Sequence, residues 1–331
     1  MKVALFDTRQ YDRQGFTAAN AQRGHELVFF EERLTARTAV LAQGCPVVVS
    51  FVNDVVDAAA LEELKRNGVQ LLALRCAGWN HVDVAAAHRL QIPVVRVPAY
   101  SPEAVAEHAV ALLLTLNRKI HRAFNRVRES NFSLDGLVGF NVHGSTVGVV
   151  GTGQIGVAFA RIMAGFGTRL LGFDVYPNQD LARQIGLQYV PLEELLATSD
   201  VVSLHCPLTP QTHHLINADA LSRMRPRVVI LNTGRGGLID TRALIQALKE
   251  SRIGGAALDV YEEEAGVFFQ DLSGEVLQDD VLARLLTFPN VLVTSHQGFL
   301  THEALNAIAA TTLDNVTALE SGRPLQHLLT L

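Results

Sequence analysis

Short runs of apolar residues alternate with longer amphipathic stretches along the first hundred residues. The runs at 2–6, 47–51, 70–75 and 94–97 have the length and the aliphatic content of buried strands. Between two of them, the periodic spacing over 54–67 predicts a helix, and Gly68 supplies a typical stop signal. Strands that alternate with helices indicate a parallel α/β sheet.

A second series of strands begins near residue 145. Consecutive Val, Ile and Leu residues are typical of strands that are buried on both faces of a sheet. A long apolar helix is predicted over 102–117, then a polar, basic stretch to residue 131, and a last helix over 301–320. The six predicted strands match the count of a full dinucleotide-binding domain, and they cover Ser145–Val150, Arg169–Phe173, Val201–His205, Val228–Asn232, Gly255–Leu258 and Val291–Thr294.

A glycine-rich turn joins the first strand of the second series to a helix. Gly151, Gly153 and Gly156 form the pattern GxGxxG, with Gln154 and Ile155 at the start of the helix. The glycines allow a tight turn, a close approach of a pyrophosphate and close helix–strand packing, and the helix N-terminus favours the negative charge.

An acidic residue ends the next strand and completes this fingerprint. Asp174 follows Gly151 by 23 residues, at the position where a carboxylate accepts hydrogen bonds from the ribose hydroxyls. Its charge would repel a 2′-phosphate. The sequence therefore predicts that the cofactor is NAD and not NADP.

Three further loops follow late strands and carry groups suited to the reduction of a keto acid. Arg235 lies among glycines after one strand, Glu264 follows the next strand, and His296 follows the last. Parallel strands end at a common edge, where α/β proteins bind ligands. Such a reduction needs a cation for the substrate carboxylate, a proton donor, and a carboxylate that keeps the donor protonated and oriented.

On these motifs the chain resembles the D-isomer-specific 2-hydroxyacid dehydrogenases over essentially its whole length. The resemblance implies that Arg235 binds the substrate, that His296 is the acid/base, and that Glu264 pairs with His296. It rests on GTGQIG with Asp174, HCPLTPQTHHLIN (205–217), LNTGRGGLID (231–240), ALDVYEEE (257–264) and TSHQGFLT (294–301).

The same resemblance implies contacts with the substrate and with the cofactor. The backbone amides of Ala77 and Gly78 would hold the substrate carboxylate, and Tyr100 and Phe299 would bound a small side-chain pocket. Asp259 would lie at the cofactor or behind Arg235, with a purely structural role as the alternative. The remaining cofactor contacts implied are His205, Cys206, Pro207, Thr233 and Gly234.

The expected substrate is pyruvate, reduced to D-lactate. The stretch 266–286, the sequence HQGFLT and Tyr100 resemble the branch of the family with that activity, and bulky aromatic residues suit a methyl group. Two alternatives stay open: a larger 2-keto acid as substrate, and a non-enzymatic NAD-sensing protein like the corepressors of related fold.

The resemblance also implies how the two predicted sheets are connected. The fold expected is α/β with two Rossmann-like parallel-sheet domains. The NAD-binding domain, residues 101–299, would be inserted into a flavodoxin-like substrate domain made of residues 1–100 and 300–331. A homodimer is expected, with a tetramer as the alternative, and the apolar run 109–116 is predicted to be buried between domains or subunits.

Composition narrows the partners and the compartment. The formal net charge of −5 argues against nucleic acid as a partner. No apolar run approaches the roughly 20 residues of a membrane span, and Asp7 comes too early for a signal peptide. Three cysteines without a CxxC pair fit a reducing compartment, so a cytoplasmic location is expected.

A metal site is not expected from the sequence. His213 and His214 follow His205 and Cys206 closely, but no acidic or thiol ligands accompany them at zinc-site spacing. The loop that begins at His205 is therefore interpreted as lining the cofactor.

Overall fold

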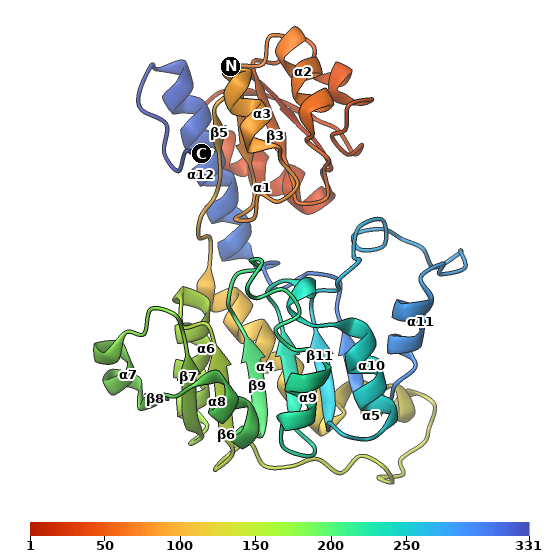
Figure 1. Ribbon diagram of the computed structural model, residues 1–331. Helices are drawn as coiled ribbons and strands as arrows, with labels where there is room; N and C mark the ends of the chain where they lie inside the picture. The colour runs from red at the N-terminus through yellow and green to blue at the C-terminus, as the bar shows by residue number, and fades with distance from the viewer. Residues whose placement is uncertain (331) are drawn as a thin grey trace. The chain divides into compact units, whose positions relative to one another are not determined.

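The computed structural model describes residues 1–330, which form two compact units (Figure 1). One unit comprises Met1–Ser101 together with the chain from Leu300 onward, and the other comprises Pro102–Phe299. Leu331, the last residue of the predicted substrate domain, lies outside the described residues. The second unit is therefore a continuous segment, whereas the first unit is assembled from both ends of the chain.

The first unit contains a parallel sheet with the strand order β2-β1-β3-β4-β5. This is the order of flavodoxin-like doubly wound folds. Strand β2 was not predicted, because it lies at the edge of the sheet, where its residues are only partly covered. The strands are β1 (Lys2–Leu5), β2 (Glu26–Phe29), β3 (Val47–Ser50), β4 (Leu71–Leu74) and β5 (Val94–Val95).

The last helix of the chain belongs to this first unit, where it packs against α1 and β4. Helix α2 begins later than predicted, because the Asp57 side chain caps it by accepting a hydrogen bond from the Ala60 amide. The elements that cover the sheet are α1 (Gln10–Asn20), the 3₁₀ turn η1 (Ala39–Ala42), α2 (Ala58–Arg66), α3 (Val84–Arg89) and α12 (His302–Glu320).

The second unit contains a larger parallel sheet with the order β12-β11-β10-β9-β6-β7-β8. The order reverses between β9 and β6, which is the topological switch point of a Rossmann fold. Strand β8 is a three-residue edge strand that was not predicted. The strands are β6 (Thr146–Val150), β7 (Arg169–Phe173), β8 (Leu187–Tyr189), β9 (Val201–Leu204), β10 (Val229–Asn232), β11 (Gly255–Leu258) and β12 (Val291–Val293).

Helices cover both faces of this sheet, as Figure 1 shows. Neighbouring strand residues point to opposite faces: Val149 packs with α4, α6 and α7, whereas Val150 packs with α8 to α11. The elements are α4 (Pro102–Arg118), α5 (Ile120–Arg128), α6 (Gln154–Gly165), α7 (Gln179–Ile185), α8 (Leu192–Thr198), α9 (Ala218–Arg223), the 3₁₀ turn η2 (Gly236–Leu238), α10 (Thr241–Lys249) and α11 (Asp280–Leu286).

The apolar run on α4 packs inside the second unit. Ala109, Leu113 and Leu116 are buried in the core that α4 shares with α6. The polar, basic stretch that follows forms α5, a helix with no buried residue.

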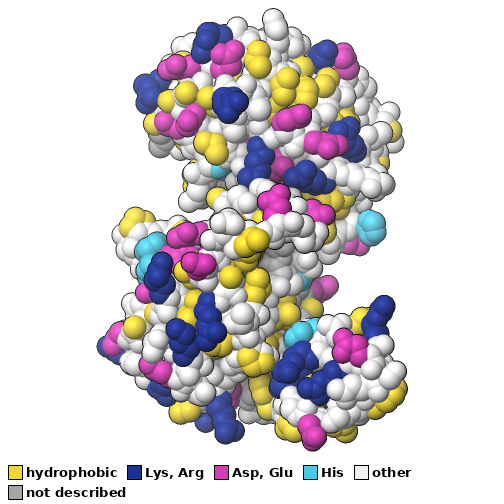
Figure 2. Space-filling model, turned by 90° about the vertical axis from the view of Figure 1, so that its right-hand side faces the viewer, with side chains coloured by type: hydrophobic (Ala, Val, Ile, Leu, Met, Phe, Trp, Pro, Cys, Tyr) yellow, Lys and Arg dark blue, Asp and Glu magenta, His cyan; other side chains and the backbone are white. Residues whose placement is uncertain are grey.

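The surface charge and the helix lengths are relevant to whether the chain binds nucleic acid or a membrane. On the face seen in Figure 2, Lys and Arg side chains are interspersed with Asp and Glu. Within residues 1–330, the helices are too short or too polar for any of them to cross a bilayer.

Candidate active site

The three glycines of the turn after β6 have different surroundings. Gly151 has a φ of +91°, and a Cβ there would lie 2.6 Å from the Cys206 amide nitrogen. A Cβ on Gly156 would lie 2.0 Å from the Gly151 carbonyl oxygen. Gly153, the N-cap of α6, has open space around it and no side-chain cap. The first glycine therefore allows close packing on the loop after β9 and the third allows close packing of α6 on the turn after β6, while the second leaves room for a ligand at the helix N-terminus.

Asp174 follows β7 beside this turn. One carboxylate oxygen accepts hydrogen bonds from the Thr152 amide (2.6 Å) and hydroxyl (3.0 Å), and the other accepts from the Tyr176 amide (2.9 Å). Burial alone would raise the pKa of Asp174, but these hydrogen bonds outweigh it and lower the pKa. The carboxylate is therefore negatively charged near neutral pH, as discrimination against a 2′-phosphate requires.

The loop after β9 begins with His205, Cys206 and Pro207. Burial lowers the pKa of His205 to about 3, so its imidazole is neutral, and its Nε2 lies 2.8 Å from the Ser203 hydroxyl. Burial also raises the pKa of the Cys206 thiol to about 11. A protonated thiol is a poor nucleophile, so these residues are suited to lining a ligand and not to attacking one.

The side chain of Asn232, at the end of β10, shapes the turn that carries Arg235. It accepts a hydrogen bond from the Gly234 amide (3.0 Å) and donates one to the Arg235 carbonyl (2.8 Å). Close packing also fixes the turn, because a Cβ on Gly236 would lie 2.1 Å from the Tyr261 carbonyl carbon. The half-buried Arg235 guanidinium is thereby held at the carboxyl edge of the sheet.

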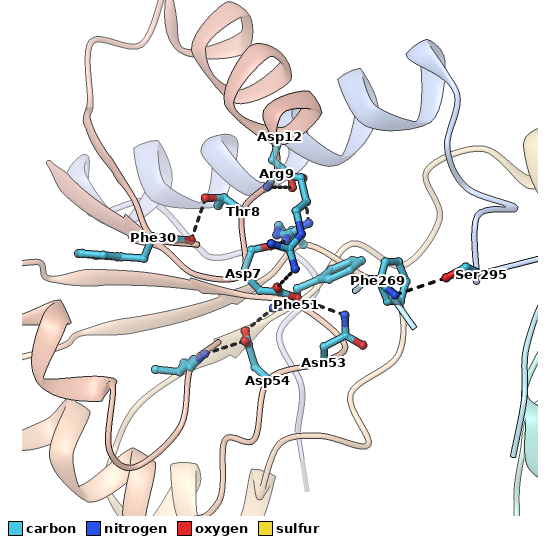
Figure 3. A network of polar contacts seen from close by, with 12 residues as sticks. Asp7, Thr8, Arg9, Asp12, Phe30, Phe51, Asn53, Asp54, Phe269 and Ser295 are labelled. Atoms are coloured by element: carbon cyan, nitrogen blue, oxygen red, sulfur yellow. Dashed lines mark hydrogen bonds and ion pairs between the residues drawn. The ribbon is translucent and has the colours of Figure 1, made fainter. Parts of the chain in front are cut away.

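His296 and Glu264 form a hydrogen-bonded pair. His296 Nδ1 lies 2.9 Å from Glu264 Oε1, and both side chains are partly exposed. His296 has a φ of +50°, and the Phe269 ring lies 5.9 Å from its imidazole. The Phe269 amide in turn donates to the Ser295 hydroxyl at 3.3 Å (Figure 3). Because Nδ1 is engaged by Glu264, Nε2 is the nitrogen left for a reacting group.

Asp259, for which a cofactor contact, support of Arg235 and a structural role were all left open by the sequence, holds the loop that carries His296. Its carboxylate accepts hydrogen bonds from the Gln297 amide (2.9 Å) and the Gly298 amide (2.8 Å), and its carbonyl accepts one from the His296 amide (2.7 Å). Burial would raise the pKa of Asp259, but its hydrogen bonds, that from His108 foremost, lower it. The residue is almost completely buried, so its role is to shape this loop.

The expected substrate residues belong to both units. Ala77 and Gly78 lie on the loop after β4, where the Ala77 carbonyl accepts a hydrogen bond from Arg96 at 2.9 Å. Tyr100 lies near the end of the first segment of that unit and is half-buried. Phe299 is the last residue of the second unit, and its side chain is buried.

A buried ion pair precedes the Ala77–Gly78 loop, and sequence reasoning missed it. Arg75 Nη1 lies 2.9 Å from Asp12 Oδ1, and both side chains are almost fully buried. The Arg75 Nη2 also donates to the Asp7 carbonyl at 2.6 Å, and the guanidinium lies 3.9 Å from the centroid of the Phe51 ring. A charged residue at the end of the apolar strand LLAL was the available signal.

The surrounding network joins the ends of neighbouring elements in the first unit, as Figure 3 shows. The Arg9 amide donates to the second Asp12 oxygen at 2.9 Å, and Asn53 donates to the Asp7 carboxylate at 3.1 Å. Asp54 accepts from the Phe51 amide at 2.7 Å, although it was predicted to begin a helix. The loop that contains Ala77 and Gly78 thus starts from a fixed anchor.

The residues of the second unit fit a bound dinucleotide. The Thr233 hydroxyl is buried and has no hydrogen-bond partner among the described residues, as expected for a group that faces a ligand's polar atoms. Gly153 offers open space at the N-terminus of α6, and Asp174 offers a carboxylate after β7.

Comparison with known proteins agrees with this geometry. The model of the D-isomer specific 2-hydroxyacid dehydrogenase NAD binding domain matches residues 110–298. The chain is 54% identical to the D-lactate dehydrogenase of Escherichia coli K12 over 322 residues, which are 97% of this chain and 98% of that protein.

Solved structures give the same result over the whole chain. The apo-structure of the Escherichia coli D-lactate dehydrogenase matches with a TM-score of 0.92 and 51% identity, covering 100% of both chains. The pyruvate reductase of Chlamydomonas reinhardtii matches with a TM-score of 0.94 and 45% identity, covering 98% of both chains. The chain therefore belongs to the D-isomer-specific 2-hydroxyacid dehydrogenase family and has its NAD-binding domain.

Proposed function

We propose that this chain is an NAD-dependent D-lactate dehydrogenase that interconverts pyruvate and D-lactate. The observation that carries the proposal is the His296–Glu264 pair, at 2.9 Å, on the sheet edge that also holds Arg235 and the glycine turn. The relatives named above, a D-lactate dehydrogenase and a pyruvate reductase, act at the same substrate pair.

Each chemical role in this reaction falls to particular residues of the chain or to the cofactor. NADH, when bound, would supply a hydride for the keto carbon of pyruvate. His296 donates a proton from Nε2 to the carbonyl oxygen, while Glu264 holds Nδ1 and stabilises the protonated ring. Arg235 has a planar fork of donors that suits the substrate carboxylate and polarises the carbonyl. In the oxidative direction His296 accepts the proton from the lactate hydroxyl.

Substrate and cofactor contacts outside this trio are part of the same proposal. Ala77 and Gly78 bind the substrate carboxylate through their amides, and Tyr100 and Phe299 limit the side-chain space. Support for a small pocket comes from the aromatic character of the last two residues. The cofactor contacts proposed are Gly151, Gly153, Gln154, Ile155, Gly156, Asp174, His205, Cys206, Pro207, Thr233 and Gly234.

The direct test is NADH oxidation with a panel of 2-keto acids, followed by chiral analysis of the product. We expect the highest kcat/KM with pyruvate and D-lactate as the product. A higher kcat/KM with 2-ketoisocaproate would instead identify a dehydrogenase of larger acids. NADH binding without oxidation by any 2-keto acid would favour the NAD-sensing alternative, and L-lactate would contradict the family's stereochemistry.

The role of His296 is tested separately. We expect His296→Gln to lower kcat by about a hundredfold or more, because the acid is lost while NADH binding is retained. His143→Gln, at an exposed histidine outside the proposed site, is the matched control and should keep full activity. Near-normal kcat in His296→Gln would place the proton donor elsewhere.

The quaternary structure proposed is a homodimer, with the segment 120–140 at its interface. Support comes from the large apolar side chains that this segment exposes, because exposed apolar surface commonly marks a site of protein–protein contact. Sedimentation of the wild type should give twice the chain mass, and a Phe132→Ser/Leu134→Ser variant should sediment as a monomer. Four times the chain mass would indicate a tetramer. The exposed residues are Ile120, Phe124, Val127, Phe132, Leu134, Val138 and Phe140.

A cytoplasmic location is also proposed. The three cysteines are free thiols in the structure, as is common where the environment is reducing. Cell fractionation with an antibody against the chain tests this point, and recovery with secreted proteins would contradict it.

A further inference from the structure

A cluster of metal-ligand side chains lies outside the residues assigned above. One ligand atom from each of His213, His214 and Glu262 lies within 4.8 Å of the other two. His214 Nε2 is 2.5 Å from Glu262 Oε1, and the two imidazole rings are 3.9 Å apart between centroids. Two imidazoles and a carboxylate are a donor set that suits Zn²⁺, with the remaining coordination filled by water.

The fold brings these ligands together from two separate loops. His213 and His214 lie on the loop between β9 and α9, and Glu262 lies on the loop after β11. His214 has a φ of +51°, an uncommon conformation for a residue with a side chain. Its amide donates to the Gly237 carbonyl at 2.8 Å, which anchors the loop beside η2. Uncommon backbone conformations of this kind concentrate at functional sites.

Hydrogen bonds from Thr241 orient the carboxylate of Glu262. Its second oxygen accepts hydrogen bonds from the Thr241 hydroxyl at 3.0 Å and the Thr241 amide at 3.3 Å, at the first turn of α10. These bonds leave the first oxygen directed toward His214. Metal-binding carboxylates are commonly held by outer hydrogen bonds in this way.

We propose that His213, His214 and Glu262 form a binding site for a divalent transition-metal ion of the Zn²⁺ class. Zinc lies roughly 2.1 Å from nitrogen and oxygen ligands, so two ligands of a tetrahedral site are about 3.4 Å apart. The ion would take the place of the hydrogen bond between His214 Nε2 and Glu262 Oε1 and move these two atoms apart by about 1 Å. His213 is the exposed member of the cluster, so its ring turns to complete the site and the ion enters from solvent.

The site adjoins the loops that carry the proposed catalytic residues. Glu264 follows Glu262 by two positions, and Gly236, next to Arg235, packs directly on the backbone of Tyr261 and Glu262. A bound ion would therefore tie the His213–His214 loop to the loop that supports Arg235 and Glu264.

The test uses the full-length chain, free of any affinity tag and treated with EDTA. Zn²⁺ is titrated in competition with a chromogenic indicator, and Co²⁺ is added separately as a spectroscopic probe. We expect one ion per chain and visible Co²⁺ absorption typical of low-coordinate nitrogen and oxygen ligation. His213→Ala and Glu262→Gln should each weaken Zn²⁺ binding by at least about tenfold and abolish the Co²⁺ spectrum.

His302→Ala is the matched control, because His302 is an exposed histidine on α12, far along the chain from the cluster. This variant should bind both ions as the wild type does. A wild-type dissociation constant for Zn²⁺ above about 100 μM would overturn the proposal. That limit corresponds to a binding free energy of roughly −5.5 kcal/mol. Equal binding by wild type and His213→Ala would also overturn the proposal. His213→Ala removes an exposed ring, and an unchanged Tm and unchanged NADH binding check that it is folded.

Discussion

The three glycines of the GxGxxG turn have different structural roles. They are Gly151, Gly153 and Gly156. A Cβ on Gly151 would collide with backbone atoms of His205 and Cys206, and a Cβ on Gly156 would collide with the Gly151 carbonyl, whereas Gly153 faces open space. The three positions therefore allow folding and cofactor binding to be separated by single substitutions.

We expect Gly153→Ala to fold normally but to bind NADH weakly, because the added methyl group occupies the space left for the pyrophosphate. Gly156→Ala should instead destabilise the fold by about 1–3 kcal/mol, as overpacking does. Thermal denaturation and a fluorescence titration with NADH measure the two effects. The distinction fails if Gly153→Ala lowers Tm as much as Gly156→Ala does.

Cofactor choice rests on the charge of Asp174. Because its hydrogen bonds lower its pKa, the carboxylate stays ionised at neutral pH, and we expect Asp174→Ser to reduce the preference for NADH over NADPH by about tenfold or more, roughly 1.4 kcal/mol. The ratio of kcat/KM for the two cofactors is the measurement. Asp180→Ser, at an exposed carboxylate on α7, should leave that ratio unchanged. An unchanged ratio in Asp174→Ser would assign the discrimination to other contacts.

The roles of residues within local motifs could be predicted from the sequence. Contacts between residues far apart along the chain could not. The glycine turn and Asp174 share one short βαβ unit, so the sequence alone places them together. The partners of Asp259 include His108, which lies 151 residues before it, and Glu262 meets His214 across 48 residues. Such contacts depend on the order of the strands in the sheet. The spacing of residues along the sequence does not predict that strand order.

At the scale of elements, burial decided which strands and helices were recognised. Strands such as β3 and β9 are buried along their whole length and read as continuous aliphatic runs. Strands β2 and β8 lie at sheet edges, and α5 buries no residue, so none of the three has that pattern. An element that contributes little to a core leaves little trace in the hydrophobic pattern.

The Arg75–Asp12 pair joins the end of β4 to α1, and its removal should weaken that junction. We expect Arg75→Met to destabilise the protein by about 3–5 kcal/mol, because Asp12 is left as an unpaired buried charge. Urea unfolding measures this change. Arg66→Met breaks an exposed pair with Glu63 on α2 and should cost at most about 1 kcal/mol. Equal effects of the two substitutions would contradict the structural role of the buried pair.

Stability of the whole molecule should carry a pH signature from Asp54. Burial raises the pKa of Asp54 to about 6 in the folded state, above the ordinary value of 3.8, so the folded state binds this proton more tightly. The group therefore adds stability as the pH falls through 6 and loses that contribution as the pH rises. Between pH 7 and pH 5 the gain from this one group should be about 1 kcal/mol.

The measurement is the difference in unfolding free energy between the wild type and Asp54→Asn at pH 7 and pH 5, because groups common to both proteins cancel. We expect this difference to shift in favour of the wild type at the lower pH. A difference that stays constant, or that shifts toward the variant, would show that Asp54 titrates near its ordinary value.

The nested connectivity has a consequence for the order in which the protein forms during synthesis. The five strands of the first unit leave the ribosome early, but α12, which packs on α1 and β4, is made last. Residues such as Ala309 and Leu313 of α12 are completely buried in that unit. The inserted unit, being continuous, has all its strands once residue 299 has emerged. The first unit thus completes its core only after the inserted unit has been synthesised, and until then the apolar surface that α12 covers stays exposed.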